Sequence, residues 1–117
     1  MFQLAPFCSR YYGTDLSGSI LERTRETAAR LQLGQIKLAN LPADRIDELD
    51  ESCFDGVVIN SVIQCFSGHN YLRQVLRRAI EHLKETGWIF LGDLMDLDLK
   101  SDLEHTFEAF AAYYKWL

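Results

Sequence analysis

The sequence predicts an α/β fold with a mainly parallel sheet, formed by a single domain. Short apolar segments of strand length alternate with longer segments in which apolar residues recur at helical spacing. The clearest strand, residues 54–60, is nearly all apolar in its second half, as expected for a strand buried on both faces of a parallel sheet. Alternation of strands and helices requires right-handed crossovers, and these make neighbouring strands parallel.

The first elements are a short strand and a helix. Residues 1–7 fit the last turns of a helix, with Pro6 marking its end, and residues 11–14 form an apolar strand. Ser19 and Glu22 have the spacing of a capping box at the start of the next helix, and Gly34 supplies its stop. The apolar positions expected to face the core are Ile20, Thr24, Ala28 and Leu31.

Two further strands and a second helix follow. Residues 35–39 fit a strand, an acidic stretch at 44–51 fits a short helix, and residues 54–60 fit the central strand. Asn70 can cap the next helix, and Gly87 ends the turn before a buried strand that reaches Leu91. The apolar stripe of this helix contains Leu72, Val75, Leu76, Ala79, Ile80 and Leu83.

A final helix is expected to begin at Asp98 or Ser101. Its apolar positions fall on one face and are Leu99, Leu103, Phe107, Phe110, Tyr114 and Leu117. The element order is therefore β-α-β-(short helix)-β-α-β-α, and residues 1–117 form one domain.

Composition excludes several classes of protein. The 117 residues are 48% hydrophobic and 25% charged, with a net charge of −5, which argues against a nucleic-acid partner. Cys8, Cys53 and Cys65 show neither metal-ligand nor disulfide spacing and fit free thiols of a reducing compartment. A membrane partner is not expected, because no apolar run approaches the length of a span. We therefore expect a cytoplasmic protein that binds neither nucleic acid nor membrane.

Polar residues follow each apolar strand at the edge where ligands bind in parallel sheets. They are Asp15, Asn40, the pair Asn60 and Ser61, and Asp93. Any one of them has a structural explanation, since strands usually end in polar loop residues. Their joint occurrence indicates a ligand site at the carboxyl edge of the sheet.

Four residues are candidate cofactor ligands. Asp15 could bind a ribose diol, because a carboxylate accepts two hydrogen bonds from vicinal hydroxyls. Alternatively, it is a helix-entry residue that the positive end of the following helix favours. Asp44 suits an adenine amino group or a solvated helix cap. Asn60 and Ser61 suit the wall of a cofactor pocket, or the end of a strand. The sequence shows neither a catalytic triad nor a set of metal ligands, so no catalytic residue is assigned.

Three stretches resemble one family. They are YYGTDLS at 11–17, FDGVVINSVIQCF at 54–66 and IFLGD at 89–93. Together they resemble the class I S-adenosylmethionine-dependent methyltransferases, and most of all the methyltransferase domains of nonribosomal peptide synthetases. The resemblance implies a Rossmann-like three-layer sandwich that binds S-adenosylmethionine. It implies that Asp15 binds the ribose, that Asp44 approaches the adenine, and that Asn60 and Ser61 flank the methionine moiety.

The chain also departs from the family pattern. Arg45 stands where the family often has an acid, and Met95 stands where it often has an arginine. The family's first strand and glycine-rich loop would precede Met1, and its antiparallel strands would follow Leu117. We therefore expect a partial domain that binds cofactor weakly or not at all when isolated and is inactive alone. Without the first strand, residues 11–14 and 54–60 are expected to pair directly, or a second chain fills the gap and makes a homo-oligomer.

The favoured interpretation is a fragment of a peptide-synthetase methyltransferase domain. The intact domain would methylate an amino acid or peptide bound to a carrier protein. The alternative is a non-catalytic scaffold or dimerisation module. An NAD-binding fragment also uses an acid after its second strand, but it gives the NSVIQ and IFLGD strings no role.

Overall fold

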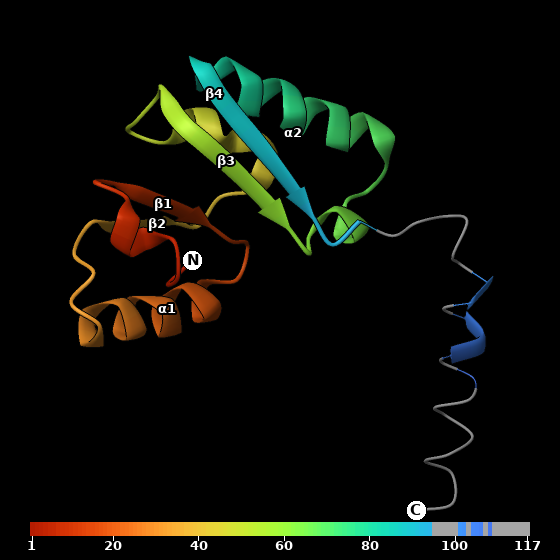
Figure 1. Cartoon of the computed structure of the whole chain (residues 1–117), viewed down its shortest axis with the longest axis horizontal. Helices are drawn as coiled ribbons and strands as arrows, with labels where there is room; N and C mark the ends of the chain where they lie inside the picture. The colour runs from red at the N-terminus through yellow and green to blue at the C-terminus, as the bar shows by residue number, and fades with distance from the viewer. Residues whose placement is uncertain (95–100, 103, 107, 109–117) are drawn as a thin grey trace, which may run out of the picture.

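The computed structural model describes residues 1–94, 101, 102, 104–106 and 108, and it is a mixed α/β structure with two parallel strand pairs (Figure 1). In chain order the elements are η1 (Ala5–Phe7), β1 (Tyr11–Thr14), α1 (Gly18–Arg30), β2 (Ile36–Ala39), η2 (Ala43–Glu48), β3 (Phe54–Asn60), η3 (Ile63–Cys65), α2 (His69–Glu81) and β4 (Leu83–Gly92), where η marks a short 3₁₀ helix. The predicted alternation is confirmed, and β1 and β3 have the predicted bounds.

The strands form two separate sheets. In one, β1 pairs with β2 from Tyr11 opposite Ile36 onward; in the other, β3 pairs with β4. Within the described residues no strand pairing joins β1 to β3, so the expected direct pairing is wrong. Side chains hold these strands together instead, because the rings of Tyr12 and Phe54 pack edge to face with centroids 5.5 Å apart.

The start of the chain and the entry to α1 differ from prediction. Pro6 lies inside a single 3₁₀ turn rather than at the end of a longer helix. The cap of α1 is Ser17, whose Oγ accepts from the Ile20 amide at 3.3 Å, so the capping box at Ser19 is wrong. Ser17 has the extended backbone that a cap requires, while Ser19 already lies in the first turn.

The end and the buried face of α1 also differ. The helix ends at Arg30, and Gln32 takes the left-handed conformation (φ 58°) that was expected at Gly34. Leu21 and Ala28 are buried, and they define the inward face. Ile20 and Leu31 lie outside that face, with 52% and 50% of their surfaces exposed.

Helix α2 covers the second sheet. Its cap is Gly68, at φ 143°, rather than Asn70, which lies inside the first turn. Val75 and Ala79 are almost fully buried and form the inward row. Leu83 belongs to β4 rather than to the helix, because the chain joins β3 directly after α2: the Phe54 amide donates to the His82 carbonyl at 2.8 Å.

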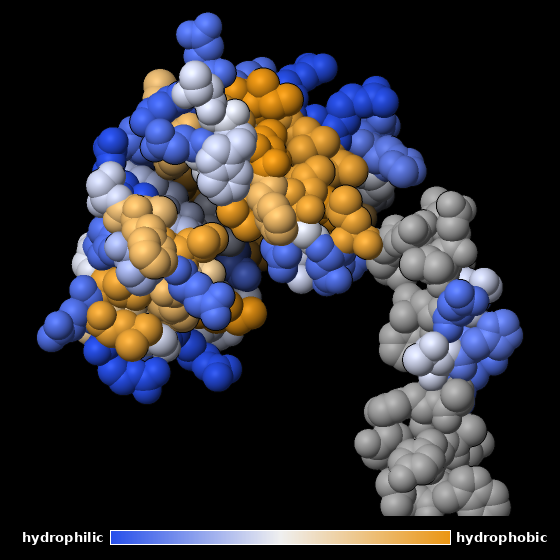
Figure 2. Space-filling model, viewed as in Figure 1, coloured by the Kyte–Doolittle hydropathy of each residue, from blue (hydrophilic) through white to orange (hydrophobic). Residues whose placement is uncertain are grey.

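The other face of the second sheet is open. Gly56 lies opposite Trp88 and Val58 lies opposite Phe90, so these residues share the face turned away from the buried Ile59. Val58, Trp88 and Phe90 are 40–53% exposed, and Figure 2 shows apolar surface gathered over β3 and β4. The Trp88 indole covers Gly56, where a Cβ would collide with the ring.

Two findings complete the fold. Over the residues described, no helix has the length and apolar character needed to cross a membrane. The apolar positions predicted for the last helix (Leu99, Leu103, Phe107, Phe110, Tyr114 and Leu117) lie outside the described residues. The described residues of that segment are helical and exposed.

Candidate functional site

Asp15 lies directly after β1, at the carboxyl edge of the first sheet. Its Oδ1 accepts from the Ser17 amide at 2.7 Å, which fixes the half-buried carboxylate at the entry to α1. Asn40, which follows β2, donates its side-chain amide to the Asp15 carbonyl at 2.8 Å. The second carboxylate oxygen of Asp15 has no hydrogen-bond partner in the described part of the chain. Asp15 therefore serves the helix entry and keeps an acceptor for a ligand.

Asn60 and Ser61 lie at the same edge of the second sheet. The Asn60 side-chain amide donates to Ser61 Oγ at 2.9 Å, and both residues are exposed. The Ser61 amide donates to the Gly92 carbonyl at 3.3 Å, which ties the end of β3 to the end of β4. The Asn60 side chain lies close over Gly92, so a Cβ at position 92 would require Asn60 Oδ1 to move.

The backbone is unusual where both of these strands end. Ser61 and Asp93 take left-handed conformations, with φ of 58° and 57°. Each such residue costs about 1 kcal/mol relative to a right-handed conformation when it is not glycine. Strained backbone of this kind clusters at ligand sites, where the surrounding structure holds it in place. The positions therefore mark the carboxyl edge of β3 and β4 as the part of this sheet most suited to a ligand.

Asp44 has a different environment. It lies on η2, where its Oδ1 accepts from the Tyr71 hydroxyl at 2.8 Å and its Oδ2 accepts from the Gln74 side chain at 3.2 Å. The pKa of Tyr71 is raised above its ordinary value, mainly because burial disfavours the phenolate and also because of its hydrogen bond to Asp44. Asp44 thus ties η2 to α2. These two hydrogen bonds engage both of its carboxylate oxygens before any ligand binds.

The structure brings some of these residues together and leaves others apart. Asp15 joins Asn40, Asn60 joins Ser61, and Asp44 joins α2. Across the described residues, no hydrogen bond or ion pair links these three groups to one another. Ion pairs tie the first half of the chain to the segment that precedes β3, near the amino end of that strand: Lys37 Nζ pairs with Asp50 at 2.9 Å, and Arg10 pairs with Glu51. The carboxyl edges that hold the candidate ligands are therefore not cross-linked.

Two residues of this region could not be found from the sequence. Tyr71 and Gln74 bind Asp44 from positions 27 and 30 residues away. On a helix surface, neither residue type signals such a contact. In the described ranges, no group of three or more His, Cys, Asp or Glu side chains is placed to hold a metal ion.

The chain is similar to known proteins over most of its length. Residues 1–89 match the family described as "Methyltransferase domain". A probable non-canonical nonribosomal peptide synthetase, CymA of Salinispora arenicola, is 37% identical over 94 residues, or 80% of this chain. Chondramide synthase cmdD of Chondromyces crocatus is 34% identical over 98 residues, or 83% of this chain. The matched region is a small part of each relative, 1% of the first and 2% of the second.

Proposed function

The chain belongs to the methyltransferase-domain family, and on that basis we propose that it forms part of an S-adenosylmethionine-dependent methyltransferase domain of a nonribosomal peptide synthetase. The observation that supports this most directly is the half-free Asp15 carboxylate at the end of β1, in a chain whose relatives include such a synthetase. The substrate of the intact domain is an amino acid or peptide held on a carrier protein.

The candidate ligands fit the cofactor unequally. Asp15 fits the ribose, because one oxygen is held by Ser17 and the other can accept from a hydroxyl. Asn60 and Ser61 fit the methionine end, because both are exposed polar groups at the carboxyl edge. Asp44 fits the adenine less well, since Tyr71 and Gln74 already engage its carboxylate. We keep Asp44 as a ligand through its remaining lone pairs.

The cofactor, when bound, supplies a methyl group activated by a sulfonium centre. The chain's own residues contribute binding and orientation, and positioning of two reactants can supply much of the acceleration of such a transfer. Asp15 holds one end of the site on the first sheet, and Asn60 and Ser61 hold the other end on the second. No described side chain is assigned to proton transfer.

The fold proposed for the complete domain is a three-layer sandwich around one sheet. A strand between β1 and β3 would pair the inner edges of both sheets, and helices would cover the open face that contains Val58, Trp88 and Phe90. In the 117-residue chain alone, a strand of a second copy would fill the same gap and give a homo-oligomer. We propose a cytoplasmic setting for both forms.

A ligand titration followed by NMR tests the proposal even when binding is weak. S-adenosylmethionine added to the chain should shift the backbone amide signals of Asp15, Asn60 and Ser61, and NAD at the same concentration should not. An equal response to NAD would favour a dinucleotide-binding fragment. Silence with both ligands would contradict cofactor binding by this chain and favour the scaffold or dimerisation module.

A further inference from the structure

Tyr71 lies in the first turn of α2, where it contacts the segments that follow two different strands. Its hydroxyl donates to Asp44 Oδ1 at 2.8 Å, and Asp44 belongs to η2, which follows β2 in the chain and packs on α2. Its ring packs edge to face on Phe66, with centroids 5.0 Å apart. Phe66 lies in the loop 61–68, which follows β3. One side chain therefore joins η2 to the loop after β3.

Each of these two contacts has further support. Gln74, about one turn along α2 from Tyr71, donates to Asp44 Oδ2 at 3.2 Å, so each carboxylate oxygen has a partner on α2. The Phe66 amide donates to the Ile63 carbonyl at 3.1 Å, which closes η3 and fixes the backbone that presents the ring. Tyr71, Asp44 and Phe66 are all half-buried. The Tyr71 side chain is thus held at both its hydroxyl and its ring.

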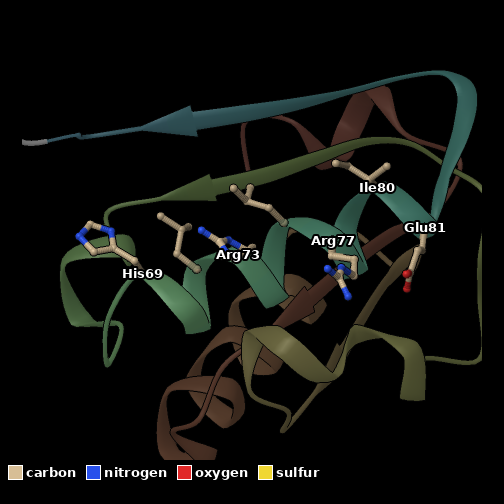
Figure 3. Close-up of a pocket in the computed structure, with 7 residues that line it drawn as sticks. His69, Arg73, Arg77, Ile80 and Glu81 are labelled. Atoms are coloured by element: carbon tan, nitrogen blue, oxygen red, sulfur yellow. The ribbon is translucent and has the colours of Figure 1, made fainter.

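The side of α2 that binds η2 is separate from its other exposed side. Tyr71 and Gln74 are three residues apart and share one helix face, the face that contacts Asp44. Arg73 and Arg77 line a groove on another side of the helix, as Figure 3 shows. Substitutions on the groove side therefore change α2 and leave both bonds to Asp44 in place, which makes them suitable controls.

We propose that Tyr71 is a positioning residue of the cofactor site, a role that rests on the function proposed above. Through its hydroxyl, Tyr71 sets where η2 presents the Asp44 carboxylate to the adenine amino group. Through Phe66, it fixes η2 relative to the loop that begins at Ser61, at the methionine end of the site. Tyr71 acts through these two neighbours and not by contact with the cofactor.

The two hydrogen bonds give the Asp44 carboxylate a fixed orientation toward the base. Each carboxylate oxygen has two lone pairs, so an oxygen that accepts from Tyr71 or Gln74 keeps one for an amino group. Burial raises the pKa of Tyr71, so its hydroxyl stays protonated at neutral pH, as a donor must. Without this hydroxyl the carboxylate is free to turn, and the preference for a base that has an amino group should fall.

Amide hydrogen exchange of the full chain without ligand tests the two contacts separately. Tyr71→Phe keeps the ring on Phe66 and loses the bond to Asp44, so exchange should rise several-fold in η2 and stay unchanged in the loop 61–68. Phe66→Leu keeps the Tyr71 hydroxyl and should have the opposite pattern. Tyr11→Phe removes a phenol hydroxyl from β1 and, as the matched control, should change neither segment. Unchanged exchange of η2 in Tyr71→Phe, or an equal rise throughout the chain, would overturn the positioning role.

The preference between two bases tests whether this positioning serves the cofactor. In S-inosylhomocysteine a carbonyl replaces the base amino group of S-adenosylhomocysteine, and NMR titration gives the dissociation constant of each ligand. The unsubstituted chain should prefer the adenine ligand, Tyr71→Phe should lower that preference several-fold, and Arg73→Ala on the groove side should keep it. An unchanged preference in Tyr71→Phe, or an equal loss of affinity for both ligands, would overturn the positioning role. No response of the unsubstituted chain to either ligand would instead overturn the proposed cofactor binding, while the exchange experiment still decides whether Tyr71 fixes the two segments.

Discussion

Replacing Asp15 separates its part in the helix entry from its part in ligand binding. The Asp15→Ala variant loses the 2.7 Å hydrogen bond from the Ser17 amide and the negative charge beside the start of α1. A hydrogen bond to a charged group contributes about 1.5 kcal/mol at the low end of its range, which suits a half-buried carboxylate. A charge near a helix N-terminus adds about 0.5 kcal/mol. We therefore expect Asp15→Ala to lower the free energy of unfolding by about 2 kcal/mol.

The Asp15→Asn variant keeps an acceptor for the Ser17 amide and loses the charge. Its expected cost is about 0.5 kcal/mol. It should nevertheless abolish the amide shifts caused by S-adenosylmethionine, because the amide oxygen takes the place of Oδ1 against Ser17 and the remaining NH₂ group cannot accept from a ribose hydroxyl. Urea unfolding followed by circular dichroism measures the first effect, and the NMR titration measures the second.

The two outcomes refute different parts of the reasoning. Equal destabilisation by alanine and asparagine would show that the bond to Ser17 adds nothing to stability. Unchanged ligand shifts in Asp15→Asn would show that Asp15 serves only the helix entry. Glu26→Gln, at an exposed acid in the middle of α1, is the control and should change neither measurement.

The remaining predictions concern stability. Ser17→Ala should lower the free energy of unfolding in urea by about 1 kcal/mol, whereas Ser19→Ala should leave it nearly unchanged. A larger loss in Ser19→Ala than in Ser17→Ala would show that Ser19 caps the helix after all. Tyr71→Phe should cost about 1 kcal/mol through loss of the bond to Asp44. The folded-state pKa of Tyr71 is raised, so the stability that its neutral phenol contributes is fully present below pH 10.0 and is lost as pH rises through the raised pKa. The difference in free energy of unfolding between the unsubstituted protein and Tyr71→Phe should therefore shrink at alkaline pH. Gly56→Ala should cost about 1–3 kcal/mol and move the overlying indole, seen in near-ultraviolet circular dichroism.

Local sequence patterns were enough to predict β1, β2 and β3, but they missed the helix ends and the start of β4, which begins at Leu83 and contains Gly87 rather than following it. The strands at 11–14 and 54–60 have sharp boundaries, because polar residues interrupt the apolar runs at both ends. The entry to α1 offers two serines that are both good caps, and only the backbone conformation distinguishes Ser17 from Ser19. At the end of α1, a glutamine adopted the conformation that glycine favours, which composition could not indicate.

Contacts between distant residues could not be predicted. The pairing of Asp44 with Tyr71 joins residues 27 positions apart and depends on how α2 rests on η2. The contact of Tyr12 with Phe54, which joins the two sheets, is likewise not contained in the strand patterns. Sequence therefore predicted which residues lie at the carboxyl edges, but not that these edges belong to separate sheets.

The separation of the sheets has a direct consequence for the proposed site. The contacts between the two halves of the described chain, Tyr12 with Phe54 and Lys37 with Asp50, lie away from the carboxyl edges. The distance from Asp15 to Ser61 is then governed by whatever pairs with the inner edges of β1 and β3. A strand in that gap would fix both ends of the cofactor site through backbone hydrogen bonds, which are obligatory for buried strands. Pairing of a strand with the inner edges of β1 and β3 should therefore raise the affinity for the cofactor. In a scaffold that binds no cofactor, the same strand would pair without any gain in affinity.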